Sequence, residues 1–135
     1  MKPPEAPVIA DRPPAVSVCL QTLTKRADFL ACARARKAPT AGFVLQARKR
    51  DEAIVPGCIR IGYTASKKVG NAVARNRAKR RLRALARTIL PQAAHPGWDY
   101  VLIARAGETA ARPFAALEKD LRTALAKVHQ SRPAP

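Results

Sequence analysis

The sequence predicts a small α+β domain, a two-layer sandwich in which helices pack on one sheet. Apolar residues recur every three to four positions in 74–89 and 114–128, which is typical of amphipathic helices. Apolar and other residues alternate in 57–64, which is typical of a strand with one buried face. The predicted order is helix, strand, strand, helix, strand, helix.

The chain has the length of one folded domain with two tails. Its 135 residues correspond to a single domain. Residues 1–20 hold five of the twelve prolines, a composition typical of a flexible or polyproline-like segment. We therefore expect a tail over 1–20, one domain over 21–129 and a frayed C-terminal tail over 130–135.

The first predicted helix spans 25–37. Thr24 is a residue type that caps helices, and Asp28 places a negative charge in the first turn, where the helix dipole favours it. Pro39 is expected to end this helix, because proline cannot continue one.

Two strands are predicted next, over 41–49 and 57–64. The segment 50–57 that joins them contains Pro56-Gly57, a pair typical of turns. We therefore expect the two strands to form a hairpin.

A long helix is predicted from Gly70 and Asn71 onward, and Pro91 is expected to end it. Basic residues occupy most of its surface. One apolar stripe is left for the core, made of Ala74, Ala78, Leu82, Leu85 and Ile89.

The last two predicted elements are a strand and a helix. Segment 98–105, WDYVLIAR, is apolar enough to be a central strand. Pro113 suits the first position of a helix that extends to about residue 128. The apolar face of that helix is Phe114, Leu117, Leu121, Leu125 and Val128.

Positive charge is concentrated in residues 67–87, which hold nine basic side chains and no acidic one. Arg75, Lys79, Arg83 and Arg87 form a single i, i+4 row, in which each like-charge neighbour costs roughly 0.2–0.5 kcal/mol. The whole chain has 26 Lys and Arg against 9 Asp and Glu, a formal net charge of +17. These charges predict a polyanionic partner.

Several other classes of protein are disfavoured. No run of 18 apolar residues is present, so a membrane span is not expected. The first 14 residues contain prolines, Glu5 and Asp11 where a secretory signal has an apolar region, and a cytoplasmic location is therefore expected. The carboxylates are too scattered along the chain to predict a metal-dependent nuclease.

The three cysteines, Cys19, Cys32 and Cys58, are widely separated and form no CxxC pair. His95 and His129 lie far from all three in the sequence, so a zinc site is not predicted. We expect free thiols that are buried or half-buried.

The basic segment resembles a known signature. Residues 66–73, SKKVGNAV, are followed by Arg75-Asn76-Arg77, then Lys79-Arg80 and Arg83, and this string closely resembles that of the bacterial ribonuclease P protein subunit. Upstream, Leu23-x-Lys25 with Asp28-Phe29, and downstream 99–105, match the same family. The resemblance covers about residues 22–128.

The resemblance implies a mixed sheet with a topology like that of ribosomal protein S5 domain 2, including a left-handed βαβ crossover. It also implies a ribonucleoprotein whose catalytic RNA removes the 5′ leader of precursor tRNA, with magnesium ions bound mainly by that RNA and no cofactor on the protein itself. The implied partners are the catalytic RNA and precursor tRNA, with one protein copy in the complex and no activity of the protein alone.

Site residues carry over by position. The implied contacts to the catalytic RNA are Lys67, Lys68, Asn71, Arg75, Asn76, Arg77, Lys79, Arg80 and Arg83. The implied contacts to the leader, in a cleft beside the sheet, are Lys25, Phe29, Arg34, Phe43 and Tyr63. Arginine pairs bidentately with phosphate, and aromatic rings stack on unpaired bases. A packing role in the core stays open for each of the three aromatic residues.

Two positions of the expected leader cleft depart from the family pattern. Ala33 and Gln46 stand where the family often has aromatic residues, so leader binding is expected to depend more on phosphate contacts.

Arg48, Lys49, Arg50 and Arg60 are compatible with plain solubilising charge. The alternatives are a ribosomal or other RNA-binding protein outside any enzyme, and an amphipathic membrane-surface protein.

Overall fold

A five-stranded mixed sheet forms the centre of the computed structural model, which describes residues 19–51 and 57–130. The strands lie in the order β1-β4-β5-β3-β2. Their bounds are Cys19–Thr22 for β1, Arg36–Pro39 for β2, Phe43–Lys49 for β3, Cys58–Thr64 for β4 and Trp98–Ala104 for β5. The expected tails fall mostly on 1–18 and 131–135, outside the described residues, whereas Cys19 and Leu20 belong to β1.

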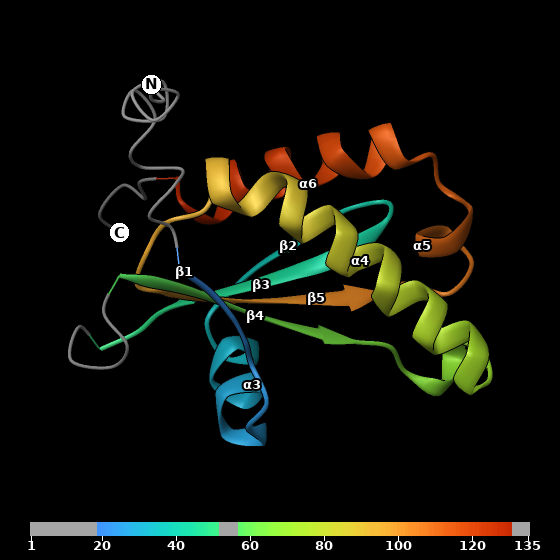
Figure 1. Cartoon of the computed structure of the whole chain (residues 1–135), viewed down its shortest axis with the longest axis horizontal. Helices are drawn as coiled ribbons and strands as arrows, with labels where there is room; N and C mark the ends of the chain where they lie inside the picture. Colours follow the sequence, from blue (N-terminus) through green and yellow to red (C-terminus); the bar gives the residue numbers. More distant parts are fainter. Residues whose placement is uncertain (1–18, 52–56, 131–135) are drawn as a thin grey trace, which may run out of the picture.

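Helices cover both faces of the sheet, so the fold has a partial third layer beyond the two that were expected. Their bounds are Arg26–Ala33 for α3, Ala72–Ala93 for α4, Glu108–Ala111 for α5 and Phe114–Val128 for α6, with a 3-10 turn η1 at Lys67–Val69. Figure 1 shows α4 and α6 on one side of the sheet and α3 by itself on the other. We call these sides the α4 face and the α3 face. The predicted α+β class is confirmed.

The predicted hairpin of β3 and β4 is wrong, because β5 lies between them. β5 pairs antiparallel with β3 and parallel with β4, while β1 and β2 form the edges. Five of the seven residues of β5 are buried, and its central position removes their apolar side chains from water, which stabilises the fold. The connection from β4 through α4 to β5 is therefore a parallel crossover, whose left-handed sense stays a prediction.

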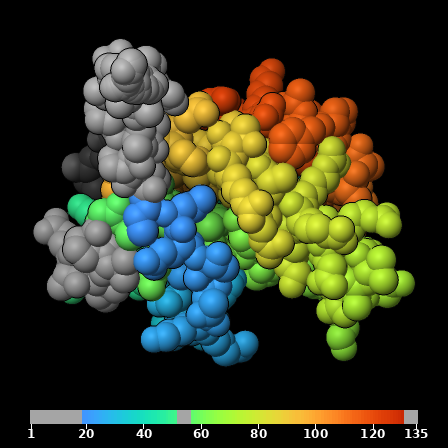
Figure 2. Space-filling model, viewed as in Figure 1, coloured from blue at the N-terminus to red at the C-terminus, as the bar shows by residue number. Residues whose placement is uncertain are grey.

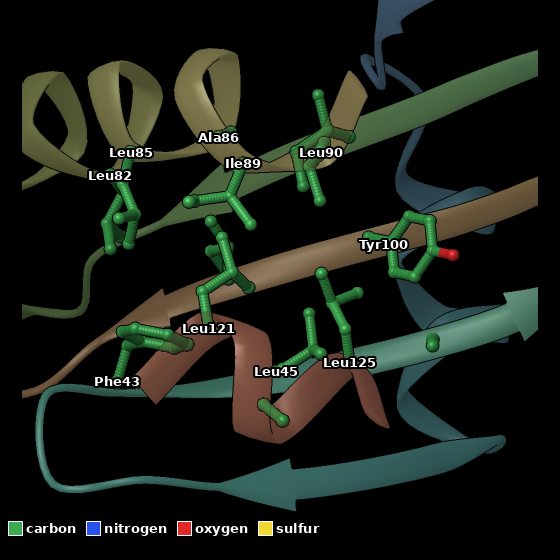
Figure 3. Packing of buried hydrophobic residues seen from close by; sticks show 14 of the residues in the cluster. Phe43, Leu45, Leu82, Leu85, Ala86, Ile89, Leu90, Tyr100, Leu121 and Leu125 are labelled. Atoms are coloured by element: carbon green, nitrogen blue, oxygen red, sulfur yellow. The ribbon is translucent and has the colours of Figure 1, made fainter. Parts of the chain in front are cut away.

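The main core lies between the sheet and the two long helices. Leu82, Leu85, Ile89 and Leu90 of α4 meet Leu121 and Leu125 of α6 above the sheet (Figure 3). The sheet contributes Phe43, Leu45, Ile59, Ile61, Tyr100 and Leu102 to the same cluster. The predicted apolar stripes of both helices face this core, except that Ala74 and Phe114 are only half-buried.

The first helix is shorter than predicted, because a strand replaces its second half. α3 ends at Ala33, and Arg36–Pro39 pairs with β3 as β2. Pro39 is tolerated there, since an edge strand leaves one side of its backbone unpaired. Thr24 is not the cap: Lys25 occupies the N-cap position and makes no side-chain capping hydrogen bond.

Proline positions in the later helices also differ from the prediction. Pro91 lies inside α4, which continues to Ala93. Its missing N–H removes only one hydrogen bond close to the helix end, and the turn still buries Ile89 and Leu90. Pro113 is the N-cap of α6, one position earlier than expected, and its carbonyl accepts from Ala116 N and Leu117 N.

Two of the cysteines form a disulfide, so the expectation of three free thiols is wrong. Cys19 and Cys58 face each other in the parallel pair β1 and β4, with their Cα atoms 4.5 Å apart. This spacing lies in the range that a disulfide bridges, and only the strand pairing brings the two residues together. Cys32 is free, and burial raises the pKa of its thiol to about 12.

Candidate nucleic-acid interface

The basic segment begins with two capped turns. Ser66 Oγ accepts a hydrogen bond from Lys68 N at the start of η1, and Asn71 Oδ1 accepts from Ala74 N at 2.9 Å at the start of α4. Asn71 Oδ1 therefore caps α4, and the Nδ2 donor of the same side chain is left to contact RNA. Figure 2 shows this part of the chain, in yellow-green, protruding at one end of the molecule.

The predicted RNA-binding side chains form an outer group and a flanking row. The outer group is exposed and comprises Lys67, Lys68, Asn71, Asn76, Arg77 and Arg80. Arg75, Lys79 and Arg83 form the row and are half-buried along one side of α4. Apart from Arg81, the basic side chains of residues 67–87 thus lie on η1 and on the part of α4 that does not face the core.

A small pocket opens at the start of the row. It has a volume of about 160 Å³ and is lined by Ala65, Ala72, Arg75, Asn76 and Lys79. The Nε atom of Arg75 is buried and has no hydrogen-bond partner among the described residues. Two cations and an amide around a pocket of this size suit an anionic oxygen of a phosphate.

Arg81 points away from this surface. Its Nη1 donates to the carbonyls of Thr109 at 3.0 Å and Ala110 at 2.7 Å, and its guanidinium lies 5.9 Å from the ring centre of Phe114. Arg81 therefore fastens α4 to α5 and α6, and it is the basic residue of this helix least available to RNA.

Tyr63 lies on the α4 face, away from Phe29. It shares a face of β4 with Ile59 and Ile61, which belong to the main core, and Arg83 lies 5.1 Å from its ring centre. Burial raises the pKa of Tyr63 against the lowering effect of Arg83 and Arg87. The expectation that Tyr63 and Phe29 line one cleft is wrong. Phe29 packs against Gly62, and Gly62 and Tyr63 are neighbours in β4 that face opposite sides of the sheet.

Phe43 is also not a leader-binding residue. Its side chain is fully buried in the main core beneath α6 (Figure 3). A ring with no exposed surface cannot stack on a base, so the core alternative holds for this residue.

Phe29 lies on the α3 face, in a notch at Gly62. A Cβ atom at position 62 would lie 2.5 Å from the Phe29 ring, so only glycine lets the ring approach the strand this closely. Leu23 packs beside it, and the ring keeps partial exposure. Lys25 and Arg34 are exposed at the two ends of α3.

Beyond Phe29 the α3 face offers a half-exposed strip of strand residues. Ile103 pairs in register with Val44 on one side and Thr64 on the other, and all three are only partly buried. Ala33 is half-buried, and Gln46 is 8% exposed. The small and polar residues at these two positions leave Phe29 as the one aromatic ring on the described part of this face.

A charge network under α3 was missed from the sequence. The carboxylate of Asp99 is fully buried and accepts hydrogen bonds from Arg48, Arg50 and Arg60 at 2.7–2.9 Å. Burial alone would raise the pKa of Asp99, but these hydrogen bonds outweigh it and lower the pKa. The interpretation of Arg48, Arg50 and Arg60 as solubilising charge is therefore wrong. The position of Asp99 inside an apolar strand could have indicated a buried carboxylate with basic partners.

The acidic residues do not form a metal centre in the described ranges. Among residues 19–51 and 57–130, no group of three His, Cys, Asp or Glu side chains lies close enough to hold a metal ion. Asp28, Asp99 and Asp120 are each engaged by arginine. In the same ranges, no helix is both long enough and apolar enough to cross a membrane.

Comparison with known proteins decides the family. The family profile Ribonuclease P matches residues 20–129, which is nearly all of the described structure. The chain belongs to the ribonuclease P protein family. The ribonuclease P protein component of Ruegeria pomeroyi is 58% identical over 125 residues, covering 90% of this chain and 99% of that protein. The corresponding component of Caulobacter vibrioides is 48% identical over 105 residues, covering 78% and 68%.

Solved ribonuclease P proteins have the same fold. The Staphylococcus aureus protein superposes with a TM-score of 0.63 at 25% identity, covering 80% of this chain and 94% of that one. The Thermotoga maritima protein gives 0.62 at 24% identity, covering 83% and 98%. The resemblance noted on residues 66–83 is therefore confirmed for the whole domain.

Proposed function

We propose that this chain is the protein subunit of a ribonuclease P and assists removal of the 5′ leader from precursor tRNA. The observation that carries the proposal is the surface at the start of α4. It carries the Arg75-Asn76-Arg77 string, in which Asn76 and Arg77 are exposed and Arg75 lines the pocket, within the region that matches the family.

In this proposal the start of α4 binds the catalytic RNA. Arg75, Lys79 and Arg83 are half-buried, so their side chains lose less conformational entropy on binding RNA than fully exposed side chains would. The pocket beside Arg75 takes one phosphate, and the exposed outer group follows the RNA backbone on either side. Removal of one such contact lowers the salt dependence of binding by about one unit of slope.

The α3 face binds the single-stranded leader in the same proposal. Phe29 offers the exposed part of its ring to one base, and Lys25 and Arg34 attract the leader phosphates from the ends of α3. Val44, Thr64 and Ile103 form the floor. Tyr63 and Phe43 are not part of this proposed leader-binding surface, because both lie on the α4 face.

Catalysis is assigned to the RNA subunit with its magnesium ions. The residues described here do not fit a protein-held catalytic metal, because the one buried carboxylate among them, that of Asp99, is neutralised by arginine. The protein's own contribution is to neutralise phosphate charge and position the leader. We further propose one protein copy in each complex, and a cytoplasmic location, where precursor tRNA is made.

Sequencing of the RNA that co-purifies with the tagged chain tests this function. One dominant structured RNA, together with precursor tRNA, is the expected result. A broad mixture of ribosomal fragments and messenger RNA would instead support the alternative of a general RNA-binding protein.

A further inference from the structure

α3 is held on the sheet by few contacts. It has eight residues, no side-chain cap, and only one buried residue, Cys32. Phe29 rests on Gly62, and Cys32 packs against Val101. With so small an apolar contact, each further interaction has a large effect on where this helix lies.

The remaining anchor is electrostatic. Asp28 Oδ1 lies 3.5 Å from Arg60 Nη2 and 3.7 Å from Arg48 Nη2. Both guanidinium groups are in turn held by the buried carboxylate of Asp99, at 2.8–2.9 Å. The two cations thus have fixed positions on the sheet, and the first turn of α3 is attached to them through one partly exposed carboxylate.

We propose that Asp28 is a positioning residue that sets the placement of α3 over the sheet and thereby the leader specificity of the enzyme. Asp28 follows Lys25 by three residues and precedes Phe29 directly, so a shift of the first turn moves both proposed leader contacts together. The inference rests on the proposed leader-binding function. It adds that the leader contacts are held by the network of Asp28, Arg48, Arg60 and Asp99.

A competing electrostatic effect has the opposite sign. Asp28→Asn raises the net charge by one beside the leader path, and charge alone then tightens the binding of any RNA. Loss of positioning weakens binding, and only for substrates that have a leader. The direction of the change therefore separates the two explanations.

The experiment measures Kd of the reconstituted holoenzyme for precursor tRNA with a leader and for leaderless mature tRNA. The wild-type protein should prefer the leader-bearing substrate. In Asp28→Asn this preference should fall about threefold to tenfold, as expected for one or two partly exposed ion pairs. Affinity for mature tRNA and for the catalytic RNA should not decrease.

Three further variants serve as controls. Asp120→Asn breaks the comparable pair with Arg112 at the far side of the molecule, with the same change in charge, and should leave the preference intact. The double variant Ala27→Asp, Asp28→Asn returns a carboxylate to the exposed first turn without the contacts to Arg48 and Arg60. It should keep the defect, whereas Asp28→Glu should recover part of the preference.

Each alternative outcome decides a different point. A wild-type holoenzyme with no leader preference would overturn the leader-binding function, and this inference with it. A normal wild-type preference that persists in folded Asp28→Asn, or that returns in the double variant, would overturn the positioning role alone.

Discussion

Arg75 combines two properties that distinguish it from the other cations of α4. It lines the pocket, and its Nε atom is buried without a partner in the described structure. A buried donor without a partner costs about 1–3 kcal/mol, and a phosphate oxygen would remove that cost. This residue therefore gives the most direct test of the RNA-binding surface.

Arg75→Ala should weaken assembly with the catalytic RNA by roughly tenfold, the size of one charged hydrogen bond. The slope of log K against log salt should fall by about one unit. Arg122→Ala is the matched control, since Arg122 is exposed on α6, away from this surface. Equal losses of affinity in the two variants would show that only net charge matters.

His129 is a second residue with a specific expectation. Tyr100 Oη accepts a hydrogen bond from His95 N at 2.9 Å and forms a second hydrogen bond with His129 Nε2 at 2.6 Å. The His95 ring stacks on His129 with centroids 3.6 Å apart. Burial, then the charges of His95 and Arg36, lower the pKa of His129 to about 4.

The folded protein should lose stability as the pH falls from about 6.5 to about 4. The unfolded state takes up a proton at His129 near pH 6.5, whereas the folded state does so only near pH 4, so acid favours unfolding in this window. Asp99, whose pKa is lowered, contributes only below about pH 4. Melting temperatures at pH 7 and pH 5 should differ less in His129→Gln than in the wild type, and equal differences would contradict this assignment.

At the scale of elements, local patterns predicted the type of each long segment but not its neighbours. The apolar stripes of α4 and α6 and the apolar run of β5 are properties of contiguous residues, and all three elements form where expected. The pairing of β5 between β3 and β4 depends on contacts distant in sequence. Residues 36–39 become a strand only because β3 offers an edge to pair with.

For the candidate site as well, local sequence patterns were predictive and contacts between distant segments were not. The string at 75–77 was recognisable because its residues are contiguous and repeat the family's order. Phe43 and Tyr63 were misassigned because exposure and face are decided by the whole sheet. The network around Asp99 joins three strands, so no local spacing predicts it.

We expect the disulfide to stabilise the edge strand β1. β1 has four residues and pairs only with β4, and the Cys19–Cys58 bond closes a separation of 39 residues. The chain-entropy model gives about 4 kcal/mol for a loop of this size. A dithiol reductant should lower the melting temperature of the wild type and leave the Cys19→Ser, Cys58→Ser variant unchanged. Identical melts of the wild type with and without reductant would contradict a stabilising role.

For the whole molecule, the net charge of +17 sets the conditions under which the fold is stable. We expect bound anions to relieve the repulsion among Arg75, Lys79, Arg83 and Arg87. A ligand that binds only the native state at a hundredfold excess over its Kd adds about 2.7 kcal/mol. Sulfate should therefore raise the melting temperature at constant ionic strength, and a flat series would show that the charges are tolerated without anions.

The central claim is that this chain assists an RNA that performs the cleavage. The direct measurement is the cleavage rate of precursor tRNA at low salt with magnesium, using rigorously RNA-free protein, a bacterial ribonuclease P RNA, or both. We predict no cleavage by the protein alone and, for the mixture, a rate well above that of either component, with the cut at the mature 5′ end. Cleavage by the RNA-free protein, or a mixture no faster than the RNA alone, would contradict the account.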